Sequence, residues 1–420
     1  MPVALLLAGC GSKPDIEVPA SLTTIGQATQ VSVHVRSAHG VRELKATLSQ
    51  NGAQYPVWQL PAPSGDKDAT FTFAAGSRST PQLQDGHATL ILDAKSSGSF
   101  SGSAHLERPV VVDSKPPTVS ADAEQHYLYR GMSDIAALDV SGSYTSAGVR
   151  VGNQTFRAWP MPGGKPGFFS LFAFAWNMPL DTIPVVYASN AAGNDVTTPL
   201  TVVFPKREQP VYTQHQIQVS EQFMQKVLGE LDPNGSGSPI ERFKKVNSEM
   251  RRANNKTLAD LRFKTADHFL WTQTFMRQEH SAAEATFADV RSYMYQGNKI
   301  DEQVHLGYDL AVTQHVGVQA SNDGVIVYAA PLGIYGNCIV VDHGYGLQTI
   351  YGHLSQIQVH VGDTVKRGQV MGLSGMTGMA GGDHIHFAMQ LDGVQIDAKE
   401  WWDPHWIRDH VSRRLDLSSS

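Results

Sequence analysis

The last third of the chain places histidine and aspartate side chains at spacings that suit a metal site. The stretch "QVHLGYDLA" carries His305 and Asp309 on either side of Gly307, and "GGDHIHFAM" carries His384 and His386. Residues two apart in an extended strand point to the same face, so each stretch presents its donors on one side. Gly307 has no side chain and leaves room between the first two donors. We expect two strands that bring imidazoles and a carboxylate together.

This set of side chains favours catalysis by a metal ion. Two histidines and one aspartate around zinc leave a fourth tetrahedral position open for water, as in catalytic rather than structural zinc sites. Zinc brings the pKa of that water to about 7 and so supplies hydroxide near neutral pH. One histidine of the 384/386 pair is left over, and "TIYGHLSQI" adds His353. Neutral imidazoles beside the water can accept its proton, and an imidazolium can donate to a developing oxyanion.

Together the motifs resemble the M23 family of zinc metallopeptidases, the LytM or lysostaphin-type peptidoglycan endopeptidases. "HLGYD" matches the family's H-x-x-x-D, "YGHLS" its isolated histidine, and "SGMTGMAGGDHIHF" matches its approach to H-x-H-F loosely. The resemblance implies one zinc ion per chain bound by His305, Asp309 and His386. It implies that His353 and His384 are the catalytic pair, without saying which is the principal base.

The same resemblance implies the substrate and the form of the site. The substrate would be stem or cross-link peptides of bacterial cell wall, cleaved at a peptide bond by a metal-activated water. The domain would be an antiparallel β structure, half-barrel-like and open as a groove. Asn337 and Tyr351 flank this expected groove and are predicted to bind substrate. Ala388 stands where many members carry Glu, outside the five site residues.

Other interpretations of these motifs fit the sequence less well. Non-heme iron oxygenases also use two histidines and a carboxylate, but they present H-x-D and need neither His353 nor His384. "VHVGDTVKRGQVMGLSG" resembles biotinyl and lipoyl carrier domains, yet Lys366 lies inside the turn pattern instead of at a hairpin tip. The main alternative is a non-catalytic M23 homologue that binds cell wall or activates an amidase. Such homologues typically lose a metal ligand, whereas all five positions are intact here.

The remaining histidines and the internal cysteine are predicted to be structural. Cys338 lies in "GNCIVVDHG" among strand-forming apolar residues and is expected to be a buried thiol. Five further histidines lack a partner pattern, with His343 expected at a turn: His315, His343, His360, His405 and His410.

Composition indicates a globular chain of several domains. The chain has 420 residues, 41% of them hydrophobic, and a net charge of −6 without long runs of one sign. This length suits roughly two to four domains, and the charge does not favour nucleic-acid binding.

Two β modules are predicted before the site, so the fold class is mainly β and multidomain. Residues 19–112 and 113–205 carry short alternating runs between Gly, Ser, Pro and Asp clusters, which favours β-sandwiches. "YASNAAGN" resembles the end of bacterial immunoglobulin-like modules. Residues 206–298 are expected to be helical, including "SAAEATFADVRSYM", with helix starts at Ser220 and Ser238. This helical segment is interpreted as a spacer, with an arm over the site as the alternative. The catalytic domain is predicted at residues 299–406 and a C-terminal tail at residues 407–420.

The N-terminal residues suggest export and anchoring. "MPVALLLAGCGSKPD" resembles a lipoprotein lipobox, which implies a signal and tether at 1–18 and a lipid on Cys10. Departures are the missing basic region and the short apolar run. The expected location is the cell envelope, facing the periplasm, with an outer-membrane anchor in a Gram-negative bacterium. A regulatory protein partner would be compatible with this arrangement.

Overall fold

The computed structural model describes residues 13–98 and 101–417. The chain is mainly β, as predicted, with helices concentrated between residues 221 and 263 and after residue 404. It divides into two compact units. The first comprises residues 1–119, 140–147 and 187–197, and the second comprises residues 120–139, 148–186 and 198–420.

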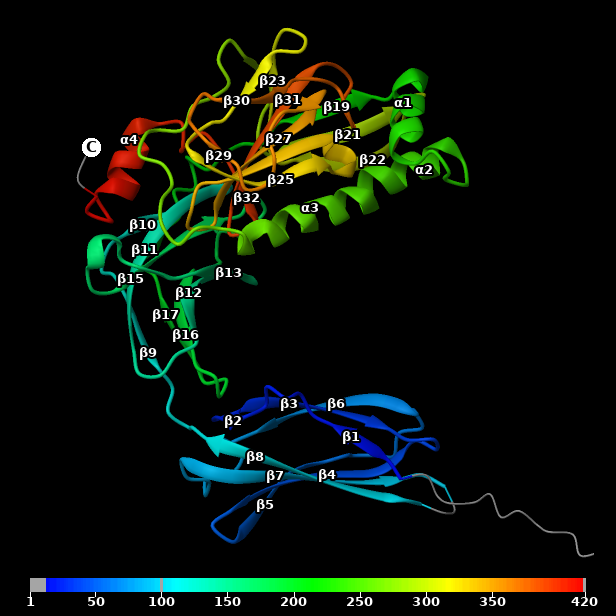
Figure 1. The fold of residues 1–420 in the computed structure, drawn as a ribbon, viewed down its shortest axis with the longest axis vertical. Helices are drawn as coiled ribbons and strands as arrows, with labels where there is room; N and C mark the ends of the chain where they lie inside the picture. The colour runs from blue at the N-terminus through cyan, green and yellow to red at the C-terminus, as the bar shows by residue number, and fades with distance from the viewer. Residues whose placement is uncertain (1–12, 99–100, 418–420) are drawn as a thin grey trace, which may run out of the picture. The chain divides into compact units, whose positions relative to one another are not determined.

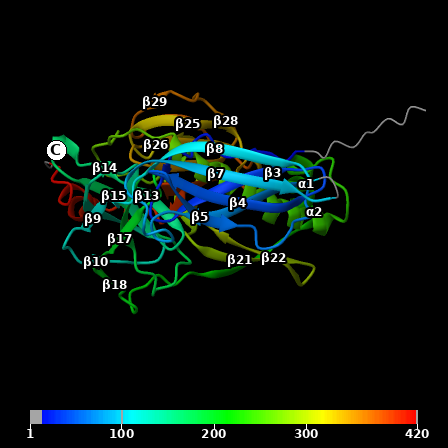
Figure 2. The ribbon, with the colours of Figure 1, turned by 90° about the horizontal axis from the view of Figure 1, so that it is seen from below.

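The first β module is a sandwich of two sheets. One sheet has the order β1-β3-β6 and the other β2-β8-β7-β4-β5, and Figure 2 shows β8, β7, β4 and β5 side by side. Val31, Val33 and Val35 alternate with more exposed residues along β3, so every second side chain enters the core. The strands are β1 Asp15–Glu17, β2 Thr24–Ile25, β3 Thr29–Arg36, β4 Val41–Gln50, β5 Ala53–Gln59, β6 Asp68–Ala75, β7 Gly86–Ser96 and β8 Ser103–Val112.

The second module also has two main sheets, with the orders β14-β15-β11-β9 and β13-β12-β16-β17, and a short parallel pair of β10 and β18. Phe156 of β13 and Phe169 and Phe172 of β15 are fully buried. The elements are β9 Thr118–Ala121, β10 His126–Tyr127, β11 Met132–Ser141, β12 Ser146–Val151, β13 Gln154–Arg157, β14 Trp159–Pro160, η1 Pro162–Gly164, β15 Phe168–Phe174, β16 Val185–Ser189, β17 Asp195–Pro199 and β18 Val202–Val203.

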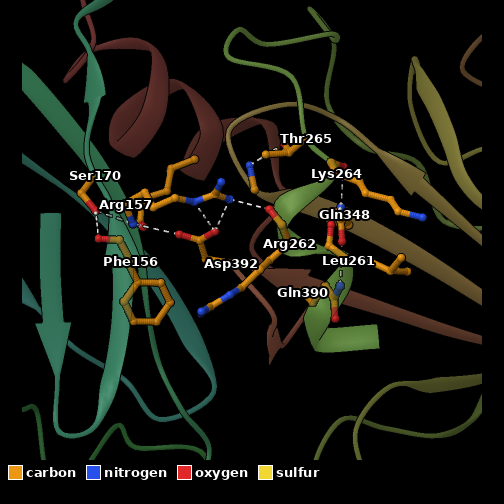
Figure 3. Close-up of polar contacts among 12 residues, drawn as sticks. Phe156, Arg157, Ser170, Leu261, Arg262, Lys264, Thr265, Gln348, Gln390 and Asp392 are labelled. Carbon is orange, nitrogen blue, oxygen red and sulfur yellow. Dashed lines mark hydrogen bonds and ion pairs between the residues drawn. The ribbon is translucent and has the colours of Figure 1, made fainter. Parts of the chain in front are cut away.

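Within the second unit, an arginine of β13 binds the C-terminal sheet. The Arg157 side chain reaches the Asp392 carboxylate and the carbonyl oxygen of Arg262, as Figure 3 shows. The backbone amide of Arg157 donates to the second Asp392 oxygen at 2.8 Å. Asp392 is 4% exposed, so its charge depends on these partners.

The C-terminal part is built from three sheets that are antiparallel except for the β19–β21 pair. The largest has the order β20-β23-β31-β27-β26-β25-β29, with β32 paired to β31; the others are β19-β21-β22 and β24-β30-β28. The strands are β19 Gln214–Gln218, β20 Ala282–Ala285, β21 Asp289–Tyr295, β22 Asn298–His305, β23 Tyr308–Ala311, β24 Gly317–Gln319, β25 Gly324–Pro331, β26 Asn337–Asp342, β27 Leu347–Leu354, β28 Gln356–Ile357, β29 Thr364–Val365, β30 Val370–Leu373, β31 His384–Leu391 and β32 Val394–Ile396.

The helical segment packs on these sheets, so its interpretation as a spacer is wrong. Phe243 and Leu258 share one buried core with Val340 and Ile350 of β26 and β27, and Figure 1 shows α3 running beside the strands. The helices are α1 Glu221–Leu231, α2 Pro239–Lys245, a π-helical turn η2 Val246–Met250, α3 Arg251–Asp260 and η3 Leu261–Phe263; further along lie η4 Gly333–Tyr335, α4 Pro404–Trp406 and η5 Ile407–Ser412.

Both predicted helix starts are confirmed, whereas one predicted helix is wrong. The Ser220 side chain accepts from the Phe223 amide, and Ser238 forms a capping box with Glu241. Residues 281–294 form β20 and most of β21 instead of a helix, because their backbone groups pair with β23 and β22. The expected domain boundary at residue 299 therefore falls inside β22. No helix among the described residues is long and apolar enough to cross a membrane.

Candidate metal centre

Strand register brings Asp309 and His386 together. β23 pairs antiparallel with β31, and Asp309 lies directly opposite His386. Directly opposite residues project to the same side of a sheet, so both side chains point into one site. His384 lies two residues before His386 on the same strand and reaches the same carboxylate, as the sequence predicted.

His305 reaches this site by a different route from the one predicted. Residues 305, 307 and 309 do not form one strand, because β22 ends at His305 and β23 begins at Tyr308. The chain bends at Leu306 and Gly307 as it passes from the sheet of β22 to the sheet of β23. The bend places His305, at the end of β22, beside Asp309 of β23. A Cβ at Gly307 would lie 2.6 Å from the Phe387 carbonyl oxygen and 2.8 Å from the His386 ring. Glycine is therefore required at the bend.

Three ligand atoms converge at this point. His305 Nε2 lies 2.9 Å from His386 Nδ1 and 3.0 Å from Asp309 Oδ1, and His386 Nδ1 lies 3.2 Å from the same oxygen. Ligand atoms about 2.0–2.1 Å from a tetrahedral zinc ion are separated by about 3.3 Å. The separations are close to that value, so the three side chains fit a zinc ion.

The protonation pattern also fits a metal ion. His305 Nδ1 lies 3.2 Å from the Thr286 carbonyl oxygen, which can only accept, so Nδ1 carries the proton and Nε2 keeps its lone pair. This is the usual way in which a backbone carbonyl fixes the tautomer of a ligating histidine. His305 Nε2, His386 Nδ1 and a carboxylate oxygen of Asp309 face one another in the site, an arrangement that suits a shared cation.

Arg291 orients the carboxylate from the other side. Its Nη2 donates to Asp309 Oδ2 at 2.6 Å, which leaves Oδ1 for the histidines. Arg291 lies on β21, within the segment for which a helix was predicted, and sequence reasoning missed it. Burial by itself would raise the pKa of Asp309, but the neighbouring histidines hold that pKa well below its usual range.

His353 enters the site through a bulge. Gly352 is opposite His386, so a regular strand would turn the next side chain to the far face. The register between β26 and β27 shifts across this stretch, and His353 has a φ of 67°. A bulge re-aims a side chain in this way. The His353 and His384 rings are 4.8 Å apart.

The two additional histidines are held in similar ways. Nδ1 of His353 donates to the Thr377 carbonyl and Nδ1 of His384 to the Gly382 carbonyl, each at 2.9 Å. His353 therefore has Nε2 available for proton transfer, whereas Nε2 of His384 lies 3.4 Å from Asp309 Oδ1. Burial lowers the pKa of His353 well below its usual value. Burial also acts to lower the pKa of His384, but the Asp309 carboxylate outweighs it and raises that pKa.

All five residues line one cavity of about 360 Å³. Its walls come from the C-terminal sheets and from the helical segment, which contributes Ser220, Phe223, Arg251 and Asn255. This agrees with the alternative interpretation of the helices as an arm over the site. Nothing in the sequence pattern indicated which helical residues face the cavity.

The two residues predicted to bind substrate do not line this cavity. Tyr351 is 2% exposed, and its hydroxyl accepts from the Ser321 amide at 2.7 Å. The Asn337 side chain donates to the Leu354 carbonyl oxygen at 2.9 Å. The Asn337 side chain links β26 to β27, and the Tyr351 hydroxyl fixes the loop before β25.

The other predicted positions lie away from the cavity. Cys338 is fully buried, and burial raises the pKa of its thiol. His343 is buried at the end of β26, where Nδ1 donates to the Asp323 carbonyl oxygen. His315, His360, His405 and His410 do not line the cavity either. Cys10 lies outside the described residues.

Comparison with known proteins finds a match over the residues that include this site. Residues 303–398 match Peptidase family M23, so the chain carries a Peptidase M23 domain in its C-terminal part. Peptidoglycan DD-endopeptidase ShyA of Vibrio cholerae is 40% identical over 94 residues, which cover 22% of each chain. DD-carboxypeptidase/endopeptidase Mpg of Neisseria meningitidis is 37% identical over 95 residues, 23% of this chain and 22% of its own.

One matched relative is named for sporulation and not for a peptidase activity. Stage II sporulation protein Q of Bacillus subtilis is 37% identical over 101 residues, 23% of this chain and 36% of its own. The similarity to ShyA and Mpg covers about a fifth of their length. The β modules and the helical segment lie outside residues 303–398, which match the family.

Proposed function

We propose, from the Peptidase M23 domain at residues 303–398, that the protein is a zinc-dependent endopeptidase of bacterial cell-wall peptidoglycan. The convergence of His305, Asp309 and His386, whose ligand atoms all lie within 4.8 Å of one another, carries this proposal. His353 and His384 line the same cavity. A purely structural zinc site would have four protein ligands and no need of two further imidazoles.

Each residue has a role that its contacts support. His305, Asp309 and His386 would hold one zinc ion, which when bound lowers the pKa of a coordinated water to about 7. Arg291 keeps Asp309 oriented, and Thr286 fixes the His305 tautomer. His353 and His384 would accept a proton from the attacking water, stabilise the oxyanion by hydrogen bonding and pass a proton to the leaving amine. The bond broken is a peptide C–N bond, and water supplies the new carboxylate oxygen.

The name of one matched relative supports a peptidoglycan substrate, since ShyA is named as a peptidoglycan DD-endopeptidase. Mpg is named as a DD-carboxypeptidase/endopeptidase, which agrees with a peptidase. The alternative is a non-catalytic homologue that binds cell wall or activates an amidase. Intact ligands and two further imidazoles in one cavity favour the enzyme.

Zinc content and cleavage together distinguish the two functions. The purified chain should contain about one zinc ion and release soluble peptides from isolated cell walls. His386→Ala removes a ligand and should lose both properties, whereas His353→Ala should keep zinc and lose release. A metal-free wild-type protein that releases nothing would support the non-catalytic alternative. Zinc retained by His386→Ala would refute the assigned ligands.

We also propose export to the cell envelope with a lipid on Cys10, which rests on the lipobox-like sequence alone. The chain should incorporate a fatty-acid label when expressed in bacteria, and Cys10→Ser should abolish labelling. Labelling that persists in Cys10→Ser would place the lipid elsewhere, and no labelling of either chain would refute the anchor.

A further inference from the structure

We propose that Arg251 of α3 is a carboxylate-binding subsite that selects peptides with a free carboxylate near the scissile bond. This inference rests on the proposed function and narrows its substrate class. Arg251 lies outside the residues that match Peptidase family M23, in the helical segment that precedes them. It lines the same cavity as the metal-binding histidines.

A short series of contacts connects Arg251 to the metal centre. Asn255 follows Arg251 by one helical turn, and both line the cavity, so they share one face of α3. The Asn255 side-chain oxygen accepts from the Tyr335 hydroxyl at 2.9 Å. The Tyr335 ring lies 5.3 Å from the His386 ring. A peptide held at the metal centre would therefore extend over Tyr335 toward Arg251.

The Arg251 guanidinium is held in place by a buried amide. Its Nη2 donates to Asn247 Oδ1 at 2.6 Å, and its Nε donates to the Asn247 backbone oxygen at 3.0 Å. Asn247 is fully buried and donates in turn to Asp301 at 2.7 Å. Asn247 belongs to the π-helical turn that precedes α3, a distortion often found at functional sites.

The one further contact of the same guanidinium among the described residues is weak, because Nη2 lies 3.5 Å from the Met379 sulfur and a thioether is a poor acceptor. Arg251 forms no ion pair with any carboxylate in residues 13–98 or 101–417, and Nη1 makes no hydrogen bond there. Arginine donors fixed in a fork suit recognition of a carboxylate. Such a preorganised and unpaired cation in a cavity indicates a ligand anion.

The charges of the cavity agree with an anionic substrate. Among the described residues that line it, Asp309 is the one carboxylate, and Arg291 neutralises it. Arg251 therefore adds uncompensated positive charge, and a zinc ion would add more. Cross-linked stem peptides carry free carboxylates, whereas a glycine bridge between stems is neutral along its length. The geometry points to the stem peptides.

Equilibrium binding of two matched peptides tests the subsite. The full chain is loaded with zinc and carries His353→Ala to prevent turnover. The probes are a synthetic cross-linked stem-peptide dimer and the same dimer with its carboxylates converted to carboxamides. Arg251→Gln in this background should weaken binding of the carboxylate dimer by about 10- to 100-fold. Binding of the amidated dimer should change by less than about twofold.

Controls separate charge recognition from a structural effect. Arg252→Gln removes a neighbouring exposed arginine and should leave both affinities unchanged. Arg251→Lys keeps the charge and should retain part of the affinity for the carboxylate dimer. The two dimers are also compared on the zinc-loaded His353→Ala protein with Arg251 intact, called the background protein. This comparison does not depend on the folding of an Arg251 variant.

Three results would overturn the subsite: equal binding of the two dimers by the background protein, equal weakening of both by Arg251→Gln, or no binding of either. Failure of the proposed function has a different signature. If zinc-loaded protein with His353 intact binds the carboxylate dimer tightly but never cleaves it, the peptidase is refuted and the subsite stands.

Discussion

At the scale of single residues, Asp309 is the side chain on which the rest of the centre depends. One oxygen faces three histidines and the other accepts from Arg291. Arg291 is largely buried and its positive charge compensates the aspartate in a site shielded from water. Removal of that arginine would leave a buried carboxylate partly unpaired and free to rotate.

Arg291→Gln should therefore weaken zinc affinity by about 10- to 100-fold, the usual effect of losing a partner of a metal ligand. Competition with a chromophoric chelator measures this change. Arg408→Gln is the matched control, because Arg408 forms an exposed pair with Asp409 and should not affect zinc. Unchanged zinc affinity in Arg291→Gln would show that the histidines hold Asp309 without help.

Residue types and spacing predicted that five side chains would come together, and these five line one cavity. The pattern did not indicate which residues support them. Histidines and aspartates two and four residues apart indicate a metal site, because few other kinds of site require these residue types at this spacing. Arg291 and Arg251 carry no such signal, since an arginine on an expected helix is usually solvated. The prediction for Tyr351 failed because an aromatic residue in a strand fits a core as well as it fits a groove.

At the scale of elements, the bend between β22 and β23 sets the position of His305. The space that a side chain at position 307 would need is occupied by the Phe387 carbonyl oxygen and the His386 ring of β31. Gly307→Ala should cost about 1–3 kcal/mol of unfolding free energy, because a methyl group forces two strands apart. Urea denaturation measures this cost, and zinc content should fall as well.

Gly382→Ala serves as the control, because a Cβ there meets nothing within 4 Å. It should change the unfolding free energy by less than about 0.5 kcal/mol. Equal stability of the two variants would mean that the strands can shift apart without strain.

A buried histidine of the second module should make its stability depend on pH. His126 Nδ1 lies 2.8 Å from Asp134 and Nε2 lies 3.2 Å from Asp122. Burial acts to lower the pKa of His126, but the two carboxylates outweigh it and raise that pKa to about 9. The charged form is therefore favoured in the folded state, and its contribution to stability is complete below pH 6.5.

That contribution should disappear as the pH rises through about 9. His126→Gln should then be less stable than wild type by on the order of 2 kcal/mol at pH 6. The difference should shrink between pH 7 and about 10, as measured by denaturant unfolding at each pH. A difference that is constant over this range would show that His126 contributes by packing and not by charge.

Local signals predicted helix starts better than they predicted strands at the edge of the site. Ser220 and Ser238 satisfy the first amides of α1 and α2, and this requirement is visible in the sequence. β20 and β21 owe their form to pairing with β23 and β22, and these partners lie further along the chain. The bulge at His353 likewise depends on β26 and β31, so no local pattern announces it.

At the scale of the whole molecule, the second β module is more than a spacer for the catalytic domain. Its Arg157 binds Asp392, and its Ser133 accepts from the Trp401 indole at 3.1 Å. These contacts lie within one compact unit. The alternation of residues allowed two β modules to be predicted. The contact between Arg157 and Asp392 could not be predicted in this way, because it joins residues 235 positions apart.

Arg157→Gln should lower the unfolding free energy of this unit by about 1–3 kcal/mol, because Asp392 would remain buried with fewer donors. Lys165→Gln provides the comparison, since Lys165 pairs with Asp416, which is 86% exposed, and should cost less than about 0.5 kcal/mol. Thermal and urea unfolding of both variants would show the contrast. Equal effects would mean that the Arg157 pair contributes no more than a surface pair.

The central claim is that the site of His305, Asp309 and His386 is a zinc-dependent peptidase centre, and metal removal tests it most directly. Purified chain is stripped with a chelator, dialysed and assayed for peptide release from isolated cell walls, then supplied with one equivalent of zinc. We predict that release stops on stripping and returns in full with about one zinc ion per chain, while His386→Ala stays inactive. Release that continues after complete zinc removal would contradict the account.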